Sequence, residues 1–466
     1  MSDTEFVVLG AGPAGLAAAY RLARAGRPVV VLERSGVPGG LASSFEVAGL
    51  CVDHGSHRLH PSCAPEVMEL LRSLLGHDLQ RRARHGRIRL GDRWVAFPPR
   101  AGDLARHLPP RFALGLARDA IAARWRRPPR EDTFAEVVRS GLGPTMAEGF
   151  YFPYVRKIWG ADPAELSGEL ARRRVGTRST GALWRKLARP STRHPDGRVF
   201  YYPKRGYGSI VARLADAAVD AGAQLRLGTE VVGLELGSDG VRVCLGDGAP
   251  VSAGQAWSTL PLPLLARLVR PAAPPEVLDA ADRLVSRALL LVYLAIDQPR
   301  HTEFDAHYFP VLDVPFSRVS EPKNYRDGRG TDPPDRTVLC AEVPCSVGDE
   351  LWRAGGDELG AIVGDGLATK GLPVARLSGV VVRRVARAYP CYGASYEPDF
   401  AAVDAWASAQ GRLLTFGRQG LFAHDNTHHA LAMGWAAADA LAGDGQVDDG
   451  RWAAARERFA AHVVED

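Results

Sequence analysis

Three glycines near the N-terminus, Gly10, Gly12 and Gly15, follow the Gly-x-Gly-x-x-Gly pattern that can bind phosphates. An apolar run over 6–9 precedes them and an alanine- and leucine-rich segment follows, which predicts a strand, a tight turn and a helix. Gly10 allows the turn, Gly12 lets the backbone approach a pyrophosphate, and Gly15 lets the helix pack closely on the strand. Free N–H groups at the start of this helix favour an anion. The pattern therefore predicts a bound dinucleotide.

An acidic residue and a second pair of glycines extend this motif. Glu33 ends the next apolar run and is placed to accept hydrogen bonds from ribose hydroxyls. The glycine pair after Pro38 would let the backbone pass close to the phosphates and ribityl chain of a longer cofactor. The extended motif resembles the fingerprint of the superfamily of protoporphyrinogen oxidase, amine oxidase and UDP-galactopyranose mutase, which implies FAD rather than NAD. The cofactor contacts predicted here are Gly10, Gly12, Gly15, Glu33, Arg34, Gly39, Gly40 and Leu41.

Length and composition predict an ordinary globular protein. A chain of 466 residues, 46% hydrophobic and 24% charged, can bury a large core and form two or three domains. No apolar run is long enough to cross a bilayer, and the first one contains the glycine turn, so no signal peptide is expected. Six cysteines without a Cys-x-x-Cys pair favour reduced thiols. We expect a cytoplasmic protein.

The chain is mildly basic, with a formal net charge of +5 and arginine clusters at 81–89 and 124–130. A nucleic-acid surface or an anionic membrane surface is one interpretation of these clusters. Solvated faces of an arginine-rich chain are the favoured one, and a basic pocket for a phosphorylated substrate is also compatible. Because no nucleic-acid-binding motif accompanies the clusters, we expect a small-molecule substrate and no nucleic-acid partner; an oligomer is allowed.

Alternation over 87–98 around Gly91 predicts a hairpin, and helices are expected near 357–368 and over 430–441. The order of the predicted elements indicates an α/β fold with a discontinuous Rossmann-type FAD-binding domain (GR2-like). A helical subdomain and a mixed β-sheet substrate domain are expected as insertions. The expected division is 1–75, 197–265 and 405–466 for the FAD-binding domain, 101–195 for the helical insert, and 76–100 with 266–404 for the β-sheet domain. Ligands in such sheets bind at the carboxyl ends of the strands. The active site should therefore lie between the FAD-binding domain and the two inserts.

Along nearly its whole length the sequence resembles UDP-galactopyranose mutase and its relatives. The resemblance rests on motifs that occur in the order of that family: the N-terminal fingerprint, 53–57, 154–160, 173–178, 202–208, 314–318, and 389–390 with 417–420. It implies a second flavin-contacting motif formed by Gly417, Arg418, Asn426 and Thr427. It also implies that the Val232 backbone pairs with the adenine edge. A place in the strand core is the other interpretation of Val232, and both can hold together.

The same resemblance implies the substrate contacts. Arg178 and Arg318 match two arginines that bind the substrate pyrophosphate in the mutases, and planar guanidinium groups suit bidentate binding of phosphate oxygens. His57 would lie against the flavin face, or else cap a turn, and Trp159 would stack on a base or fill the core. The predicted catalytic residues are His57, Arg178, Arg318 and Tyr389, and the predicted substrate contacts are Trp159, Arg178, Arg318, Tyr389 and His424.

One segment, 421–429, departs from the mutase pattern. Phe422, His424 and Asp425 replace the tyrosines that the family carries there, and Asn426 replaces a carboxylate. These replacements change half of the residues expected to bind the substrate. The sequence therefore allows a different sugar or a different reaction from those of the mutases. The histidines of this segment could move protons beside the flavin or only form hydrogen bonds. No metal site is expected, because no carboxylate or cysteine partner is apparent.

Three functions remain open at this point. The favoured one is a mutase-like isomerase that acts on a nucleotide-linked or phosphorylated sugar through N5 of reduced FAD, because the two arginines and Tyr389 suit a diphosphate. The alternative is an oxidoreductase (an oxidase, dehydrogenase or desaturase) that transfers a hydride from a substrate C–H bond to flavin N5. The third is a binding protein without flavin, like the prenyl-GTPase escort proteins. A lipid-linked substrate is compatible with each enzyme.

Overall fold

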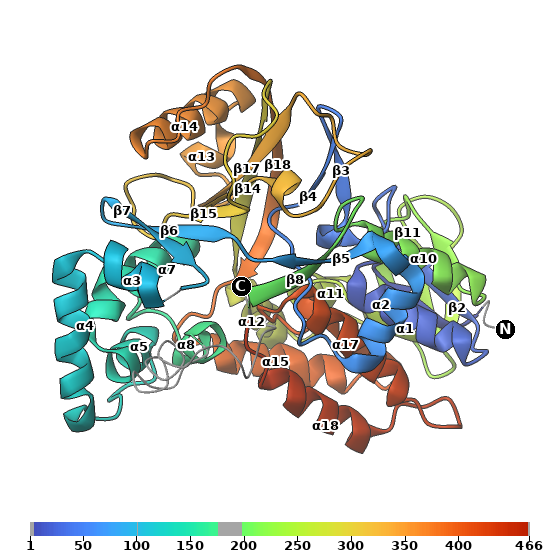
Figure 1. Ribbon diagram of the computed structural model, residues 1–466. Helices are drawn as coiled ribbons and strands as arrows, with labels where there is room; N and C mark the ends of the chain where they lie inside the picture. Colours follow the sequence, from blue (N-terminus) through green and yellow to red (C-terminus); the bar gives the residue numbers. More distant parts are fainter. Residues whose placement is uncertain (1–3, 100, 176–197, 465–466) are drawn as a thin grey trace.

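The computed structural model describes residues 4–99, 101–175 and 198–464, which form three groups of elements (Figure 1). Blue, green and red elements at the right of the view build and cover an eight-stranded sheet. Gold and orange strands, together with the light-blue strands β6 and β7, build a seven-stranded sheet, and cyan helices lie at the left. Among the described residues, no helix has the length and apolar character needed to span a bilayer.

The eight-stranded sheet contains the predicted glycine motif. Its order is β13-β10-β11-β12-β1-β2-β9, with β19 paired to β12, and β1 lies parallel between β12 and β2. Its strands are β1 (Thr4–Leu9), β2 (Val29–Leu32), β9 (Gln224–Arg226), β10 (Val231–Leu236), β11 (Val241–Leu245), β12 (Val251–Ser258), β13 (Val269–Arg270) and β19 (Leu413–Thr415). One face packs on α1 (Pro13–Arg24), α10 (Ser209–Asp220) and α17 (Thr427–Asp439). The strand, glycine turn, helix and second strand predicted at the N-terminus are confirmed.

The seven-stranded sheet is mixed, because β15 runs parallel to β6 while its other pairs are antiparallel. Its order is β18-β14-β17-β16-β15-β6-β7. The strands are β6 (Gly86–Leu90), β7 (Arg93–Phe97), β14 (Ser286–Ile296), β15 (Ala306–Tyr308), β16 (Arg318–Ser320), β17 (Thr337–Cys345) and β18 (Leu377–Pro390). Alternate residues of β14 pack on α14 (Gly356–Thr369) and on β4 (Leu50–Asp53), so both faces of this strand are buried.

The helical group and the connecting elements complete the fold. The helical group comprises α3 (Ala101–His107), α4 (Pro110–Ala122), η3 (Ala123–Trp125), α5 (Phe134–Leu142), α6 (Pro144–Met146), η4 (Ala147–Tyr151), α7 (Phe152–Trp159) and α8 (Gly168–Val175). The connecting elements are β3 (Ser44–Val47), α2 (Pro65–Leu75), β5 (Leu79–Ala83), β8 (Val199–Pro203), α11 (Leu262–Leu268), α12 (Pro275–Arg283), α13 (Glu350–Arg353), α15 (Tyr396–Ser408), α16 (Gly417–Gly420) and α18 (Asp449–Ala460).

The predicted α/β class is confirmed, and most predicted elements are present. The hairpin expected around Gly91 is β6–β7, and the helix expected near 357–368 is α14. The helix expected over 430–441 begins earlier, at Thr427, and is followed by α18, which was not predicted. The spacing of Trp452, Ala455 and Phe459, all buried, is the helical signal that the sequence carried for α18. The boundaries of the three domains stay a prediction.

Candidate functional site

The first glycine turn has the geometry that a dinucleotide requires. Gly10 has φ +102°, and a Cβ on Gly15 would lie 2.0 Å from the carbonyl oxygen of Gly10, so neither position accepts a side chain. A Cβ on Gly12 would meet no heavy atom of the described residues within 4 Å. The open space at Gly12 lies at the N-terminus of α1, where free N–H groups attract phosphate. The turn therefore fits a pyrophosphate.

The second glycine pair lies against the first turn. The N–H of Gly39 donates to the carbonyl oxygen of Ala11 at 2.7 Å, and a Cβ on Gly40 would lie 3.7 Å from the Cα of Gly12. Both glycines have positive φ, 112° and 54°. The carboxylate of Glu33, which follows β2, accepts the N–H groups of Ala11 and Ser35, both at 2.9 Å. Glu33 is thus held beside the turn, and its remaining lone pairs could accept hydrogen bonds from ribose hydroxyls.

Three of the other predicted cofactor residues differ in exposure. Arg34 is exposed, and Leu41, which directly follows Gly40, is partly exposed. Val232 is 47% exposed and lies at a bulge, since Val231 pairs with Leu245 and Gly233 with Cys244. Val232 therefore does not fill the strand core, and its backbone lies outside the register of the ladder. An adenine contact by Val232 stays a prediction.

The predicted second motif lies next to α1. A Cβ on Gly417, which has φ +80°, would lie 3.0 Å from the Cβ of Ala14. The guanidinium of Arg418 donates to the carbonyl oxygen of Ala388, and its burial lowers the pKa of Arg418. Asn426 is the N-cap of α17, and Thr427 is its first residue, so the predicted helix N-terminus is present. The two glycine motifs and the starts of α1 and α17 thus surround one region.

Arg318 is paired with a buried carboxylate that the sequence did not reveal. Arg318 and Glu342 lie opposite each other in the antiparallel pair β16–β17. Nε and Nη2 of Arg318 donate to the two oxygens of Glu342 at 3.0 and 2.8 Å. The side chain of Glu342 is 3% exposed and that of Arg318 is 17% exposed. Arg318 is therefore engaged in a bidentate ion pair inside the protein.

Glu342 also holds the turn that carries His57, because its Oε1 accepts the N–H of Ser56 at 2.8 Å. The His57 ring stacks on Tyr207, with ring centroids 5.2 Å apart. Burial and the positive charge of Arg318 lower the pKa of His57 to about 3, so the ring is neutral at neutral pH. Its buried Nδ1 has no hydrogen-bond partner among the described residues. Such an atom is consistent with a bound group at this position.

Tyr389, His424 and Trp159 form an aromatic group near the end of β18. The rings of Tyr389 and His424 stack with centroids 5.2 Å apart, and Trp159 lies 5.7 Å from His424. Burial raises the pKa of Tyr389 to about 12, and burial and Arg174 lower that of His424 well below its ordinary value. Trp159 is buried, and its indole N–H donates to the carbonyl oxygen of Pro390 at 3.1 Å. Trp159 thus fills core while bordering His424.

Asp425 is a carboxylate that lies beside His429 and His462, whereas the sequence indicated no carboxylate partner for a metal site. Its Oδ2 lies 2.9 Å from Nδ1 of His462, and its Oδ1 lies 3.7 Å from Nδ1 of His429. The ligand atoms of these three residues lie within 4.8 Å of one another. Arg173 is also close, with Nη1 3.8 Å from Asp425. This fixed positive charge compensates Asp425 and disfavours a cation in the group.

The structure brings most of the predicted substrate residues into one region. The positive charge of Arg418 contributes to the pKa shifts of His57, Tyr389 and His424. The charge of Arg318 contributes to those of His57 and Tyr389 as well. Arg178 lies outside the described residues. The residues that sequence reasoning missed are Glu342, Tyr207 and His462. Only Glu342 carried a local signal, as a lone acid inside the apolar strand 337–345, since a buried charge requires a partner.

Comparison with known proteins identifies relatives of this chain. Residues 13–440 match the family described as flavin containing amine oxidoreductase. A phytoene dehydrogenase of Streptomyces griseus is 29% identical over 300 residues, which cover 56% of this chain. The matched region spans 55% of that relative's length.

Solved structures share the fold over nearly the whole chain. A reduced UDP-galactopyranose mutase superposes with a TM-score of 0.83 at 20% identity, covering 98% of this chain and 99% of the mutase. An Exiguobacterium sp. 255-15 protein assigned as a protoporphyrinogen oxidase has a TM-score of 0.72 at 19% identity over 94% of this chain and 98% of that chain. Cyclohexylamine oxidase from Brevibacterium oxydans IH-35A has a TM-score of 0.66 at 18% identity, with the same coverage. The family match and the glycine geometry agree: the chain is a FAD-dependent enzyme of the flavin-containing amine oxidoreductase family.

Proposed function

We propose that this enzyme is an oxidoreductase that takes a hydride from a C–H bond of a small molecule whose reacting end is uncharged. The observation that carries the proposal is the ion pair of Arg318 with the buried Glu342. The S. griseus relative is a phytoene dehydrogenase, which supports dehydrogenation as the type of reaction. FAD supplies the hydride acceptor when it is bound.

The ion pair argues against a diphosphate clamp at Arg318. A guanidinium has two edges that can bind phosphate oxygens bidentately, and Glu342 occupies the one formed by Nε and Nη2 of Arg318. A diphosphate at this position would also meet the negative charge of Glu342, which burial leaves poorly screened. The pair therefore favours a neutral reacting group over a departing diphosphate.

The side chains around the pair also favour a neutral substrate end. His57 and His424 are neutral at neutral pH because burial lowers the pKa of each, and Tyr389 keeps its proton because burial raises its pKa to about 12. We infer that the Nδ1 atoms of His57 and His424, which have no hydrogen-bond partner among the described residues, orient substrate or an ordered water. A pKa of about 3 makes His57 a weak base, so its proposed role is positioning.

A mutase-like reaction is the second candidate, and one observation favours it. Burial raises the pKa of Tyr389, and the positive charges of Arg318, Arg174 and Arg418 oppose this rise, so three cations lie near this phenol. Such a charge distribution suits an anionic substrate. Of these three arginines, only Arg318 has its positive charge balanced by Glu342.

Anaerobic spectroscopy of the purified holoenzyme separates the two candidates. Loss of the visible flavin absorbance on mixing with amines, alcohols or unsaturated hydrocarbons supports the oxidoreductase. Conversion of a sugar nucleotide by dithionite-reduced enzyme, without net electron transfer, supports the mutase and contradicts the first proposal.

Binding of UDP adds a test that does not require the substrate. We expect the reduced wild-type enzyme to bind UDP weakly and Glu342→Gln to bind it more tightly, because the substitution removes the charge that competes for Arg318. Tight binding of UDP by the wild type, unchanged in Glu342→Gln, would contradict the role assigned to Glu342. The cytoplasmic location and the three-domain division remain predictions of the sequence.

A further inference from the structure

The outer edge of the helical group carries an apolar stripe. Leu114, Ile121 and Trp125 are 74%, 66% and 66% exposed, the highest values among the exposed large apolar side chains of the described residues. They lie on α4 and on the short η3 turn that continues it. Spacings of seven and four residues place them on one side of this helix. Exposed apolar side chains elsewhere in the described chain do not repeat in this way along a single helix.

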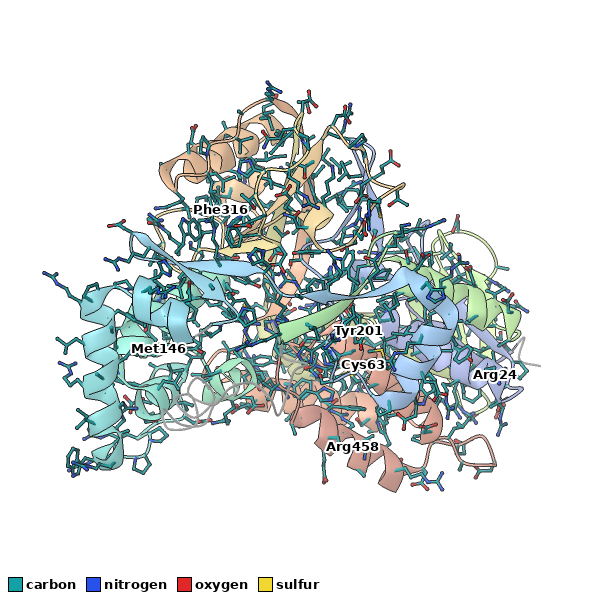
Figure 2. All side chains as sticks on the ribbon, in the orientation of Figure 1. Arg24, Cys63, Met146, Tyr201, Phe316 and Arg458 are labelled. Carbon is teal, nitrogen blue, oxygen red and sulfur yellow. The ribbon has the colours of Figure 1, made fainter. Side chains whose placement is uncertain are left out.

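The opposite side of α4 is packed, so the stripe is fixed toward solvent. The carboxylate of Asp119 is buried and accepts the N–H of Thr145 at 2.8 Å. A Cβ on Gly115 would lie 2.6 Å from Oγ1 of Thr145, and a Cβ on Gly149 would lie 2.7 Å from the Phe112 ring. In Figures 1 and 2, α4 is the outermost helix of the cyan group, and side chains project from its outer side.

Arginines surround the stripe. Residues 106–130 contain seven arginines and one acid, the buried Asp119. The exposed arginines of this stretch are Arg106, Arg111, Arg118, Arg124, Arg127 and Arg130. The chain as a whole has a net charge of only +5, so the excess of positive charge is concentrated here.

Trp125 ends the stripe beside this charge. The guanidinium carbon of Arg124 lies 3.9 Å from the centroid of the Trp125 ring. Exposed tryptophan and leucine with adjacent arginines are typical of helices that lie in the headgroup region of a membrane. Apolar side chains enter the acyl boundary there, while arginines bind lipid phosphates.

We propose that α4 and η3 dock this enzyme on an anionic lipid bilayer. Charge complementarity selects this partner over a second copy of the chain. A symmetric dimer through the same face would bring two arginine-rich edges together, and like charges would oppose the contact. Docking through this surface of the helical group does not depend on the substrate of the FAD site.

Sedimentation of the full-length holoenzyme with large vesicles tests the proposal. We expect it to pellet with vesicles of equimolar phosphatidylglycerol and phosphatidylcholine, and to partition at least about tenfold more weakly onto pure phosphatidylcholine. Binding should fall as salt is added, because ions screen the arginines. Equal partitioning onto the two kinds of vesicle would contradict the anionic requirement.

Changes to the apolar stripe give a second measurement. The triple variant Leu114→Gln, Ile121→Gln, Trp125→Gln should bind the anionic vesicles at least about tenfold more weakly than the wild type. Because the three side chains are exposed, the variant should fold and retain FAD. The matched control replaces three exposed valines on other elements by Gln: Val219, Val285 and Val347. The control should bind as the wild type does.

A third measurement of vesicle binding changes the charge of the arginines around the stripe. Arg111→Glu, Arg118→Glu and Arg127→Glu together should abolish sedimentation with anionic vesicles, since they replace attraction by repulsion. Arg213→Glu with Arg451→Glu, on exposed arginines of other helices, is the charge control and should bind nearly as well as the wild type.

Fluorescence locates the contact. Anionic vesicles should shift the tryptophan emission of the wild type to shorter wavelength, and Trp125→Phe should lose most of this shift. Wild-type binding that the triple Gln variant retains would overturn the proposal. So would light scattering that shows a dimer in the wild type and a monomer in the triple variant.

Discussion

Gly434 of α17 lies against the carbonyl oxygen of Ala14 at the start of α1. A Cβ on Gly434 would stand 2.0 Å from that oxygen and 3.0 Å from the Cβ of Ala17. The missing side chain therefore sets how closely the two helices approach. Because α1 follows the first glycine turn and α17 follows the second motif, their spacing also sets the geometry of the FAD site.

Gly434→Ala should therefore reduce both stability and FAD binding. The methyl group cannot be accommodated without separating two backbones, and we expect a loss of about 3 kcal/mol in the free energy of unfolding. Urea unfolding of the apoprotein measures this loss. The control is Gly364→Ala in the middle of α14, where a Cβ would meet nothing within 4 Å. It should stabilise the protein by about 0.5–1 kcal/mol, because alanine favours the helix. Similar effects of the two substitutions would contradict the argument.

Gly12→Ala should separate cofactor binding from folding. The backbone of Gly12 is extended, with φ −73° and ψ 177°, and a Cβ there has open space. The apoprotein should keep its free energy of unfolding, whereas its affinity for FAD should fall by about tenfold or more, because the methyl group occupies the expected path of the pyrophosphate. Fluorescence titration of the apoprotein with FAD measures the affinity. Unchanged affinity would mean that the pyrophosphate does not pass Gly12.

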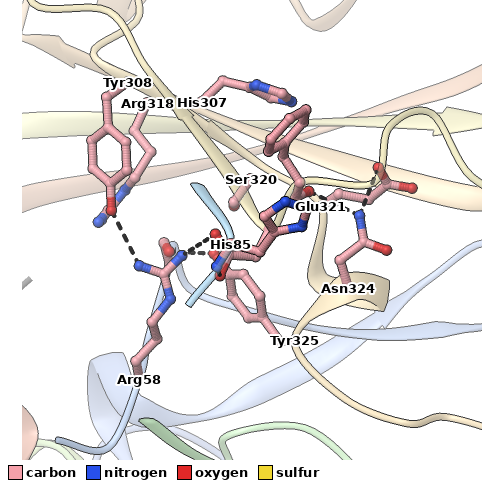
Figure 3. A network of polar contacts seen from close by, with 12 residues as sticks. Arg58, His85, His307, Tyr308, Arg318, Ser320, Glu321, Asn324 and Tyr325 are labelled. Atoms are coloured by element: carbon pink, nitrogen blue, oxygen red, sulfur yellow. Dashed lines mark hydrogen bonds and ion pairs between the residues drawn. The ribbon is translucent and has the colours of Figure 1, made fainter. Parts of the chain in front are cut away.

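A buried ion pair in the polar network around Arg58 and Tyr308 should dominate stability in this region (Figure 3). Nη2 of Arg58 lies 3.1 Å from Oδ1 of Asp305, with side chains 7% and 4% exposed, and Arg58 also donates to the hydroxyl of Tyr308 at 3.1 Å. Asp305→Ala would leave an uncompensated buried cation and should cost about 3–5 kcal/mol. Asp327→Ala, which removes the partner of the exposed Arg329, should have no measurable effect. Thermal unfolding compares the two variants.

His307 should make the protein less stable in mild acid. Its Nδ1 accepts from Nε of Arg87 at 2.9 Å, and burial lowers its pKa from 6.5 to about 3. Below about pH 6.5 the unfolded chain takes up a proton that the folded protein excludes until about pH 3. The free energy of unfolding should therefore fall as the pH drops through this window, by at most about 1.4 kcal/mol per pH unit for this group.

The variant His307→Gln tests whether His307 causes this pH dependence of the free energy of unfolding. It should show a shallower dependence of unfolding free energy on pH between about 6.5 and 4 than the wild type, whatever its stability at neutral pH. His77→Gln, at an exposed position, should keep the wild-type slope. Part of the slope should persist in both variants, because the lowered pKa of His57 acts in the same direction. An unchanged slope in His307→Gln would exclude His307 as its source.

Local features of the chain were predictable. The glycines of the first turn need particular φ values or close contacts, and β1 is apolar because both of its faces are buried, so strand, turn and helix follow from neighbouring residues. The alternation around Gly91, which has φ +57°, similarly predicted the hairpin β6–β7. The family resemblance then extended these local motifs to FAD, which the family match confirms.

Contacts between distant segments were not predictable. Whether Arg318 binds a substrate or a protein carboxylate depends on the register of β16 on β17, which places Glu342 directly opposite it. The register follows from packing of the whole seven-stranded sheet and leaves no pattern near Arg318. Likewise His462 lies 37 residues beyond Asp425 and reaches it only because α18 folds back.

By itself, the sequence determined the FAD-binding turn, the α/β class and the superfamily, because glycine conformations and apolar periodicity act over a few neighbouring residues. Only the tertiary structure decided that Arg318 is neutralised by Glu342, that His57 and His424 are buried as neutral rings, and that the apolar residues of α4 face outward. Those properties depend on burial and on partners, which arise when distant segments pack together.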